Sequence, residues 1–325
     1  MKHTLYPFQL SAITKSPIWG GDRLCREYGK SSSAATVGES WELTVRREEV
    51  SRVQNGLYAG EGLDTLIKRF GKDVTGGGFG AEDFPLLIKL IDAGDRLSVQ
   101  VHPDDSYAAR VENDRGKTEM WYIVDAEEDA EIICGLADGV DDEAFAKAVA
   151  EGRLETALKH QPVKAGEVYF IPAGLAHAIG RGILIAEIQQ NCDLTYRVYD
   201  YDRRDANGNL RELHIQKAIE VTRPFSLEEI DAIRYSNAKK DERNDPELLA
   251  ACDFFRVNRL ELHGECRSIG RRGVMQHLLC LTGGMSLSYS GERYSLQKGD
   301  SWLLPAALDG VCLEGTGSLL LSSVN

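Results

Sequence analysis

Short apolar segments that alternate with polar residues, and that end at Gly, Asn or Asp, recur along the whole chain. A period of two is typical of β-strands that bury one face. Helical patterns are few: 64–70, a stretch that starts near Asp142 and includes Phe145, Val149, Leu154 and Leu158, and a segment opened by the capping-box pair Ser226 and Glu229. We therefore expect a mainly β fold with a few helices.

A polar run at 237–247, which contains a proline, separates two patterned regions and is expected to be a solvated linker. It divides a larger part, 1–236, with a short helical insertion near 142–159, from a smaller part, 248–325.

A weak internal repeat relates these two parts. The segment 163–174 aligns without gaps on 296–307, and each copy enters an apolar strand through Gly plus an acidic residue and leaves it through Pro-Ala. The repeat predicts two copies of one β module. The same offset places Gly310 opposite His177, so we expect the second module to have no metal site and to cover an edge of the first.

Composition excludes several classes of function. The net charge of −13 disfavours nucleic acid and anionic membranes as partners. The 7 cysteines are odd in number, dispersed and free of Cys-x-x-Cys pairs, which predicts reduced thiols in a cytoplasmic protein. The chain starts without the apolar run of a signal peptide, and no stretch is apolar enough to span a bilayer. The sequence does not predict an oligomeric state.

Ionisable groups interrupt several of the expected strands. In the segment 97–102, alternation places Leu97, Val99 and Val101 on one face, and Gln100 and His102 side by side on the other. By the same rule, Lys117 and Glu119 share one face of the next patterned segment. Lys89 interrupts an apolar strand, and Glu187 belongs to the polar face of another. Because buried polar groups cost roughly 1–3 kcal/mol each when they are unpaired, such placement predicts a functional site.

Two histidines, a carboxylate and an amide from these segments predict a metal site. We expect His102, Glu119 and His177 to be ligands, with Gln100 as a weaker fourth. Imidazole and carboxylate ligands suit Zn(II), Fe(II) or Mn(II), and so few protein ligands leave coordination positions open for a substrate.

The chain resembles the short bacterial form of the type I phosphomannose isomerases. The resemblance rests on Asn191 to Arg197 and on the strings Pro17-Ile-Trp-Gly-Gly, Gly38-Glu-Ser-Trp-Glu, Gln100-Val-His-Pro-Asp-Asp, Gly116-Lys-Thr-Glu-Met-Trp-Tyr and Pro172-Ala-Gly-Leu-Ala-His. It implies a cupin fold, one bound Zn(II) ion per chain, and reversible conversion of mannose 6-phosphate into fructose 6-phosphate.

The resemblance also implies roles for individual residues. It agrees with the ligand set above and makes Arg197 catalytic. Lys117 and Asp193 are candidates for proton transfer, because aldose and ketose interconvert through an enediol and a desolvated lysine near a cation can have a lowered pKa. Four further residues are implied to line the substrate site: Trp19, Glu42, Lys89 and Glu187.

Two departures from the longer family members stand out. Gly116 replaces a histidine, and Cys192-Asp193-Leu194 replaces a Ser-Asp-Asn string. Two alternatives stay open: an isomerase of a free sugar, and a non-catalytic sugar-binding protein built from two cupin modules.

Overall fold

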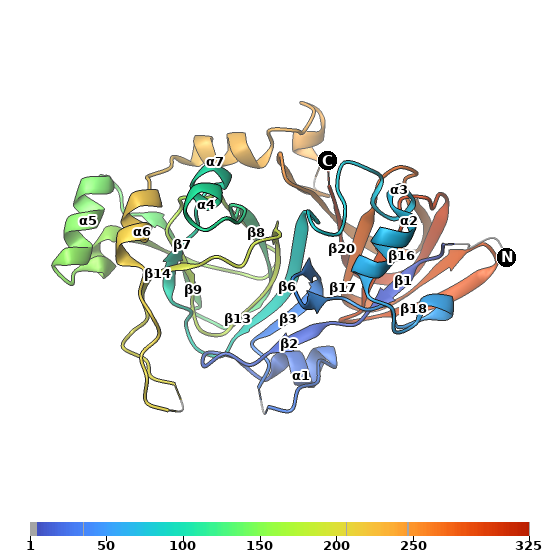
Figure 1. The fold of residues 1–325 in the computed structure, drawn as a ribbon, viewed down its shortest axis with the longest axis horizontal. Helices are drawn as coiled ribbons and strands as arrows, with labels where there is room; N and C mark the ends of the chain where they lie inside the picture. The colour runs from blue at the N-terminus through green and yellow to red at the C-terminus, as the bar shows by residue number, and fades with distance from the viewer. Residues whose placement is uncertain (1–4, 35, 206, 246, 325) are drawn as a thin grey trace.

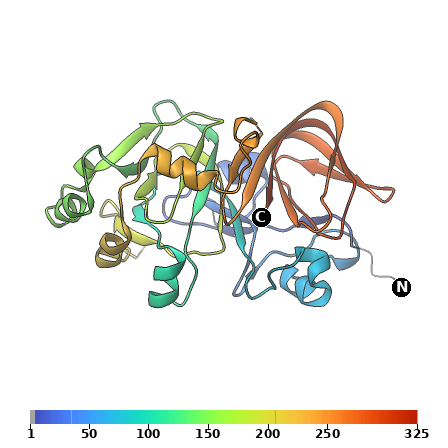
Figure 2. The same ribbon diagram turned by 90° about the horizontal axis from the view of Figure 1, so that it is seen from above.

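The computed structural model describes residues 5–34, 36–205, 207–245 and 247–324. Two β-barrels lie side by side, the second formed largely by the C-terminal residues in orange and red (Figures 1 and 2). Strands dominate both barrels, so the prediction of a mainly β fold with a few helices is confirmed.

The first barrel consists of two sheets that face each other. One has the strand order β10 (Leu158–Pro162), β9 (Glu131–Leu136), β12 (His177–Ile179), β7 (Val99–Val101) and β14 (Tyr196–Tyr199). The other has the order β11 (Val168–Ile171), β8 (Glu119–Ala126), β13 (Ile183–Gln190), β6 (Leu86–Ala93), β3 (Glu39–Leu43) and β2 (Ile13–Lys15). Strands β6 and β13 are buried along their whole length and pair with Lys89 opposite Glu187.

The second barrel is a single sheet. Its strand order is β1 (Phe8–Leu10), β19 (Ser301–Leu304), β17 (Gln276–Tyr289), β20 (Val311–Ser323), β16 (Arg256–Ile269) and β15 (Leu248–Ala251), and β18 (Glu292–Gln297) also pairs with β17. A small hairpin of β4 (Val45–Arg46) and β5 (Glu49–Val50) lies outside both barrels.

Helices decorate the two barrels. The α-helices are α1 (Arg23–Tyr28), α2 (Leu63–Phe70), α3 (Lys72–Thr75), α4 (Asp105–Val111), α5 (Asp142–Ala150), α6 (Ile215–Val221) and α7 (Leu227–Arg234). The 3₁₀ turns are η1 (Gly56–Tyr58), η2 (Leu154–Ala157) and η3 (Glu242–Asn244). None of the described helices is long and apolar enough to cross a membrane.

The predicted helices form, with one difference. Helix α2 matches the 64–70 pattern, and α7 begins with the predicted capping box of Ser226 and Glu229. Helix α5 ends at Ala150, so Leu154 lies in η2 and Leu158 opens β10 instead of extending the helix. A glycine at 152 with φ of 67° follows the helix end and turns the chain away.

The two copies of the internal repeat adopt the same local structure. Each has a glycine with positive φ, Gly166 at 90° and Gly299 at 86°, then a strand, β11 or β19, and then Pro-Ala. The structure therefore places the aligned residues in equivalent strands of the two barrels.

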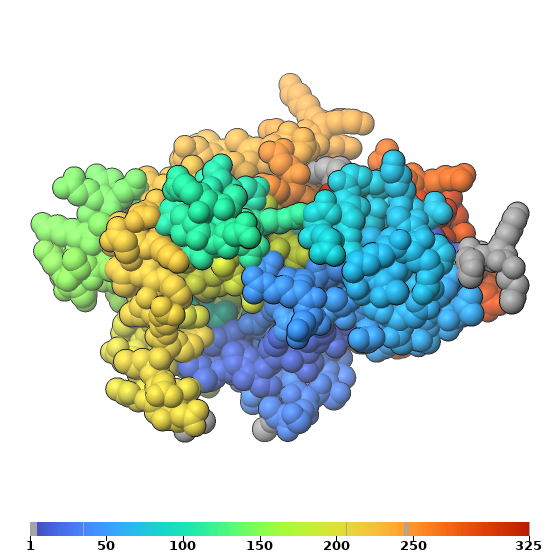
Figure 3. Space-filling model, viewed as in Figure 1, coloured from blue at the N-terminus to red at the C-terminus, as the bar shows by residue number. Residues whose placement is uncertain are grey.

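The N-terminal part contributes to both barrels. Strand β1 pairs with β19, and the amide of Ala306 donates a hydrogen bond to the carbonyl of Val74 at the end of α3. Blue and cyan N-terminal segments cover the front of the second barrel (Figure 3). As a result, the largest apolar core joins residues from both barrels.

The polar run at 237–247 is held to the second barrel by ion pairs. Glu242 lies 3.4 Å from Arg256, and Glu247 lies 2.6 Å from Arg267. Its proline, at 246, lies outside the described residues.

The expectation that all cysteines are reduced is wrong for one pair. Cys266 on β16 and Cys312 on β20 form a disulfide, with Cα atoms 6.2 Å apart. The two strands are antiparallel neighbours, and Cys312 is opposite Ser268, two residues from Cys266. Sequence spacing alone does not show this proximity, because the two cysteines are 46 residues apart.

Candidate active site

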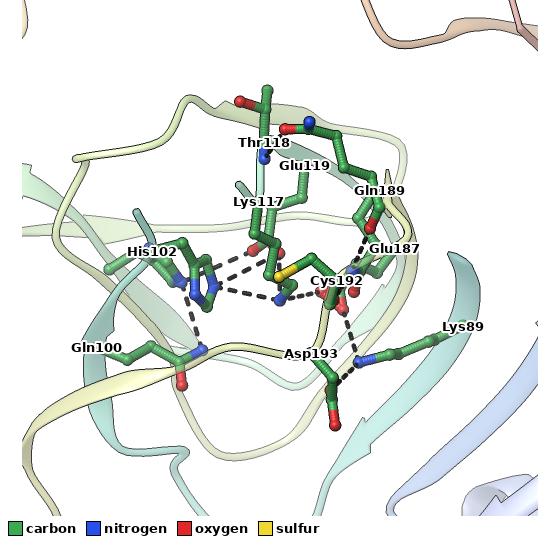
Figure 4. A network of polar contacts seen from close by, with 12 residues as sticks. Lys89, Gln100, His102, Lys117, Thr118, Glu119, Glu187, Gln189, Cys192 and Asp193 are labelled. Atoms are coloured by element: carbon green, nitrogen blue, oxygen red, sulfur yellow. Dashed lines mark hydrogen bonds and ion pairs between the residues drawn. The ribbon is translucent and has the colours of Figure 1, made fainter. Parts of the chain in front are cut away.

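Polar side chains from both sheets of the first barrel converge between them (Figure 4). His177 lies on β12, and His102 directly follows β7, both in one sheet. Glu119 opens β8 in the opposite sheet, where β6 and β13 carry Lys89 and Glu187. The two sheets therefore enclose a strongly polar cavity.

The three predicted metal ligands meet in this cavity. His102, Glu119 and His177 are buried, and their ligand atoms all lie within 4.8 Å of one another. The Nε2 atoms of His102 and His177 each lie 3.6 Å from a different oxygen of Glu119. Among the residues that the structure describes, this is the one such group of His, Cys, Asp and Glu side chains.

Both imidazoles are held with Nε2 toward the centre of the group. His102 donates from Nδ1 to the carbonyl of Leu194, and His177 donates from Nδ1 to the carbonyl of Leu175, each over 2.8 Å. Burial lowers the pKa of His102, and it lowers the pKa of His177 to about 4. Both rings are therefore neutral at physiological pH, and each Nε2 carries the lone pair with which an imidazole binds a cation.

Lys117 lies beside this group. Its Nζ is 2.6 Å from Oε2 of Glu119, 3.2 Å from Nε2 of His102 and 3.6 Å from Glu187. Burial opposes the charge on Lys117, but the two neighbouring carboxylates outweigh burial and raise its pKa.

Lys89 is surrounded by carboxylates. Its Nζ lies 3.4 Å from Asp193, 3.6 Å from Glu39 and 3.8 Å from Glu187. Burial, together with the charge of Glu119, raises the pKa of Glu187 to about 7 although both lysines oppose the rise. Glu187 can therefore exchange a proton near neutral pH.

The remaining predicted residues, except Glu42, line the same cavity. Trp19, Gln100, Asp193 and Arg197 all contribute to its wall. Arg197 is opposite Gln100 in the pairing of β14 with β7, which brings the guanidinium to the same side. The amide nitrogen of Gln100 lies 3.3 Å from Nε2 of His177.

The structure does not bring Glu42 to the cavity. Its carboxylate is fully buried on the opposite face of β3, where Lys30 at 2.8 Å and the hydroxyl of Ser40 at 2.7 Å donate to it. Glu39, three positions earlier, lines the cavity instead. Its Oε2 accepts a 2.8 Å hydrogen bond from Nε1 of Trp41. Sequence analysis also missed Arg211, which lines the cavity from the loop after β14.

Gly116, where longer family members have a histidine, has no room for a side chain. A Cβ atom there would lie 2.4 Å from the amide nitrogen of Asp105 and 2.5 Å from the carbonyl carbon of Asp104. The glycine thus packs against the start of α4, and Lys117 follows it directly into the site.

Comparisons with known proteins agree with this geometry. A family model described as the catalytic domain of type I phosphomannose isomerase matches residues 7–138, and one described as the cupin domain of mannose-6-phosphate isomerase matches 246–324. The second match confirms that the C-terminal module is cupin-like.

Full-length relatives extend the similarity. The chain is 38% identical to mannose-6-phosphate isomerase ManA of Bacillus subtilis, covering 98% of this chain and 99% of the relative. It is 36% identical to mannose-6-phosphate isomerase of Streptococcus mutans, covering 98% of each chain.

Solved structures share the fold. The crystal structure of mannose 6-phosphate isomerase from Bacillus subtilis superposes with a TM-score of 0.85 at 33% identity, over 97% of this chain and 99% of that one. A putative mannosephosphate isomerase from Archaeoglobus fulgidus, 22% identical, has the same fold with a TM-score of 0.76 over 100% of both chains. By the family models and the full-length relatives together, this chain belongs to the type I phosphomannose isomerase family.

Proposed function

We propose that the protein is a zinc-dependent aldose–ketose isomerase that interconverts mannose 6-phosphate and fructose 6-phosphate through an enediol. The observation that carries the proposal is the group of two neutral imidazoles and one carboxylate within 4.8 Å, directly beside a buried lysine. The names of the full-length relatives support the choice of substrate.

The donor set fits a single zinc ion per chain. Zinc prefers imidazole nitrogen and carboxylate oxygen, and catalytic zinc sites keep a position open for substrate or water. His102, Glu119 and His177 would hold the ion, and Gln100 would supply an oxygen if its amide were turned over. A bound zinc ion would act as a Lewis acid that polarises the sugar carbonyl or orients a hydroxyl group.

The charge of the cavity supports a phosphorylated substrate. Among the described residues that line it, four are cationic and four are carboxylates: Lys89, Lys117, Arg197, Arg211, Glu39, Glu119, Glu187 and Asp193. A divalent cation would add two positive charges to this balanced set. A phosphate monoester carries about −1.5 to −2 at pH 7, so a sugar phosphate complements the loaded site better than a free sugar.

The residues beside the ligands suit proton movement between the two sugar carbons. Lys117 lies between Glu119 and Glu187, and Asp193, whose side chain is 49% exposed, lies beside Lys89. With a pKa of about 7, Glu187 can accept a proton and release it again. Arg197 is always charged and is suited to stabilise negative charge on an enediolate oxygen.

The test is a coupled assay of the purified protein with mannose 6-phosphate, before and after chelation and with zinc restored. We expect turnover that is lost on chelation and regained with zinc. Turnover of free mannose only, or of neither sugar in the zinc-loaded protein, would contradict the proposal.

The role of Lys117 is tested by Lys117→Met, with the exposed Lys164→Met as the matched control. We expect Lys117→Met to keep one zinc per chain by elemental analysis and to lose at least about 10²-fold in kcat, the usual contribution of a positioned proton donor. Lys164→Met should match the wild type. Wild-type kcat in Lys117→Met would exclude the role.

A further inference from the structure

Trp121 touches two of the three residues proposed to hold zinc. Its indole Nε1 donates a 2.9 Å hydrogen bond to Oε1 of Glu119. Its ring meets the ring of His177 edge to face, with centroids 5.4 Å apart and planes at 76°. Trp121 is fully buried and lies two residues after Glu119 on β8, so alternation places both side chains on the barrel's inner face.

The indole gives the two oxygens of Glu119 different surroundings. Oε1 accepts from Trp121, whereas Oε2 lies 2.6 Å from the ammonium group of Lys117. A carboxylate turns readily about its terminal torsion, which is broad and roughly two-fold. The hydrogen bond to Oε1 and the ion pair at Oε2 together restrict that freedom, so the carboxylate plane is set before any cation arrives.

A second tryptophan of the first barrel makes the same kind of contact. On β3, Trp41 donates from Nε1 to the carboxylate of Glu39 over 2.8 Å, again two residues along the strand. In both strands a tryptophan follows a glutamate by two positions, and its indole N–H donates a hydrogen bond to the glutamate carboxylate. The same spacing therefore places an indole N–H against a carboxylate twice in this barrel.

We propose that Trp121 is a positioning residue of the metal site: its N–H fixes Glu119, and its ring fixes His177. The inference rests on the proposed function to the extent that the site binds a divalent cation. Trp121 does not coordinate the cation. It presets the geometry of two ligands, and hydrogen bonds of this kind to metal ligands typically contribute 10–100-fold to metal affinity.

The test compares Trp121→Phe with Trp302→Phe after chelation. Trp302 is the matched control, because it is equally buried in the second barrel and its Nε1 has no hydrogen-bond partner among the described residues. Co(II) is the probe, titrated against a competing chelator and followed by visible absorption. We expect Trp121→Phe to bind Co(II) roughly 10–100-fold more weakly, with a changed absorption spectrum. Trp302→Phe should bind as the wild type does.

Wild-type affinity and spectrum in Trp121→Phe would overturn the proposal, as would an equal loss in both variants. A second measurement does not depend on the folding of a variant. The chain has 4 tryptophans, so the indole N–H region of an NMR spectrum of the wild type has few signals. Zn(II) added to the apoprotein should shift the Trp121 indole signal strongly and leave that of Trp302 in place. An unmoved Trp121 signal at saturating zinc would also overturn the proposal.

These outcomes separate the inference from the isomerase assignment. A wild type that binds Co(II) but does not isomerise mannose 6-phosphate removes the proposed reaction and leaves the positioning role intact. Full isomerase activity together with wild-type Co(II) binding in Trp121→Phe removes the positioning role alone.

Discussion

Glu39 and Glu42 both lie on β3, but their carboxylates lie in different surroundings. Glu39 faces the cavity, with Trp41 and Lys89 as partners, and is about one-fifth exposed. Glu42 faces away from it and is fully buried against Lys30 and Ser40. The first carboxylate can meet a substrate, whereas the second can only stabilise the packing around β3.

Exchanging each carboxylate for an amide should therefore give opposite results. Glu39→Gln should stay close to wild-type stability, because Lys89 keeps Glu187 and Asp193 as counter-charges. It should lose roughly tenfold or more in kcat/KM, because a carboxylate that faces the cavity is removed. Glu42→Gln should lose about 1–3 kcal/mol of unfolding free energy, because the ammonium group of Lys30 loses its counter-charge and keeps only neutral acceptors such as the carbonyl of Gly299. Its folded fraction should keep wild-type kcat/KM. Urea unfolding and steady-state kinetics measure both, and the reverse pattern would return Glu42 to the active site.

Gly116 is a position where any side chain should be destabilising. A Cβ atom would collide with backbone atoms of Asp104 and Asp105, which cannot move without shifting α4. We expect Gly116→Ala to cost about 1–3 kcal/mol in urea unfolding, as over-packing usually does. Alanine at the exposed Gly284 serves as the comparison, because a Cβ atom there would meet no atom closer than 4.0 Å. A wild-type midpoint of urea unfolding for Gly116→Ala would show that the start of α4 can shift to make room for a Cβ atom.

At the level of single elements, alternation predicted which residues of a strand share a face only where one of the two faces is apolar. It placed Gln100 with His102, and Lys117 with Glu119, and the structure brings all four to the cavity or its edge. Alternation made no prediction for β3, where four of the five residues are buried and polarity does not distinguish the faces; Glu42 was implied by the family resemblance alone. Leu97, expected opposite Gln100, lines the cavity because β7 begins only at Val99.

Local sequence signals predicted helices better than they predicted which strands pair with each other. The capping box of α7 needs only residues three apart in sequence, and both of its hydrogen bonds form, Ser226 N–H to Glu229 at 2.7 Å and Glu229 N–H to Ser226 at 3.2 Å. The pairing of β1 with β19 joins residues almost 300 positions apart. No local pattern encodes that partner, so the docking of the N-terminus on the second barrel was not predictable.

Removing the α7 cap should loosen that helix alone. Ser226→Ala deletes one of the two capping hydrogen bonds and should cost about 1 kcal/mol. The helix has no buried residue among those described, so the loss should appear as faster amide hydrogen exchange in α7 with unchanged isomerase activity. Faster exchange spread over both barrels would show instead that α7 stabilises the whole molecule.

On the scale of the whole molecule, a buried polar chain joins the two barrels. Ser301 of β19 donates to the carbonyl of Glu42 in β3 over 2.8 Å, and its Oγ lies 2.7 Å from Nε2 of His277 on β17. Because the Ser301 hydrogen is directed at Glu42, His277 must donate from Nε2. Its Nδ1 then has no partner among the described residues, and protonation there would bury an unpaired charge.

This arrangement makes His277 a source of acid sensitivity. Burial, with a smaller contribution from Lys30, lowers its pKa to about 3 in the folded protein. An unfolded histidine titrates near about 6.5, so between these values only the unfolded state binds the proton. The stability that His277 contributes is therefore complete above about pH 6.5 and is lost as the pH falls toward 3, by about 1.4 kcal/mol per unit.

His277→Gln removes the titration and keeps an N–H donor for Ser301. Relative to pH 7.5, the wild type should lose about 2 kcal/mol more unfolding free energy at pH 5 than this variant does. Urea unfolding at both pH values measures the difference, with the exposed His263→Gln as the control expected to follow the wild type. Because one polar chain links both barrels, fluorescence of the tryptophans in either barrel should report the same midpoint. Parallel pH profiles for wild type and His277→Gln would show that His277 is already charged, or exposed, in the folded protein.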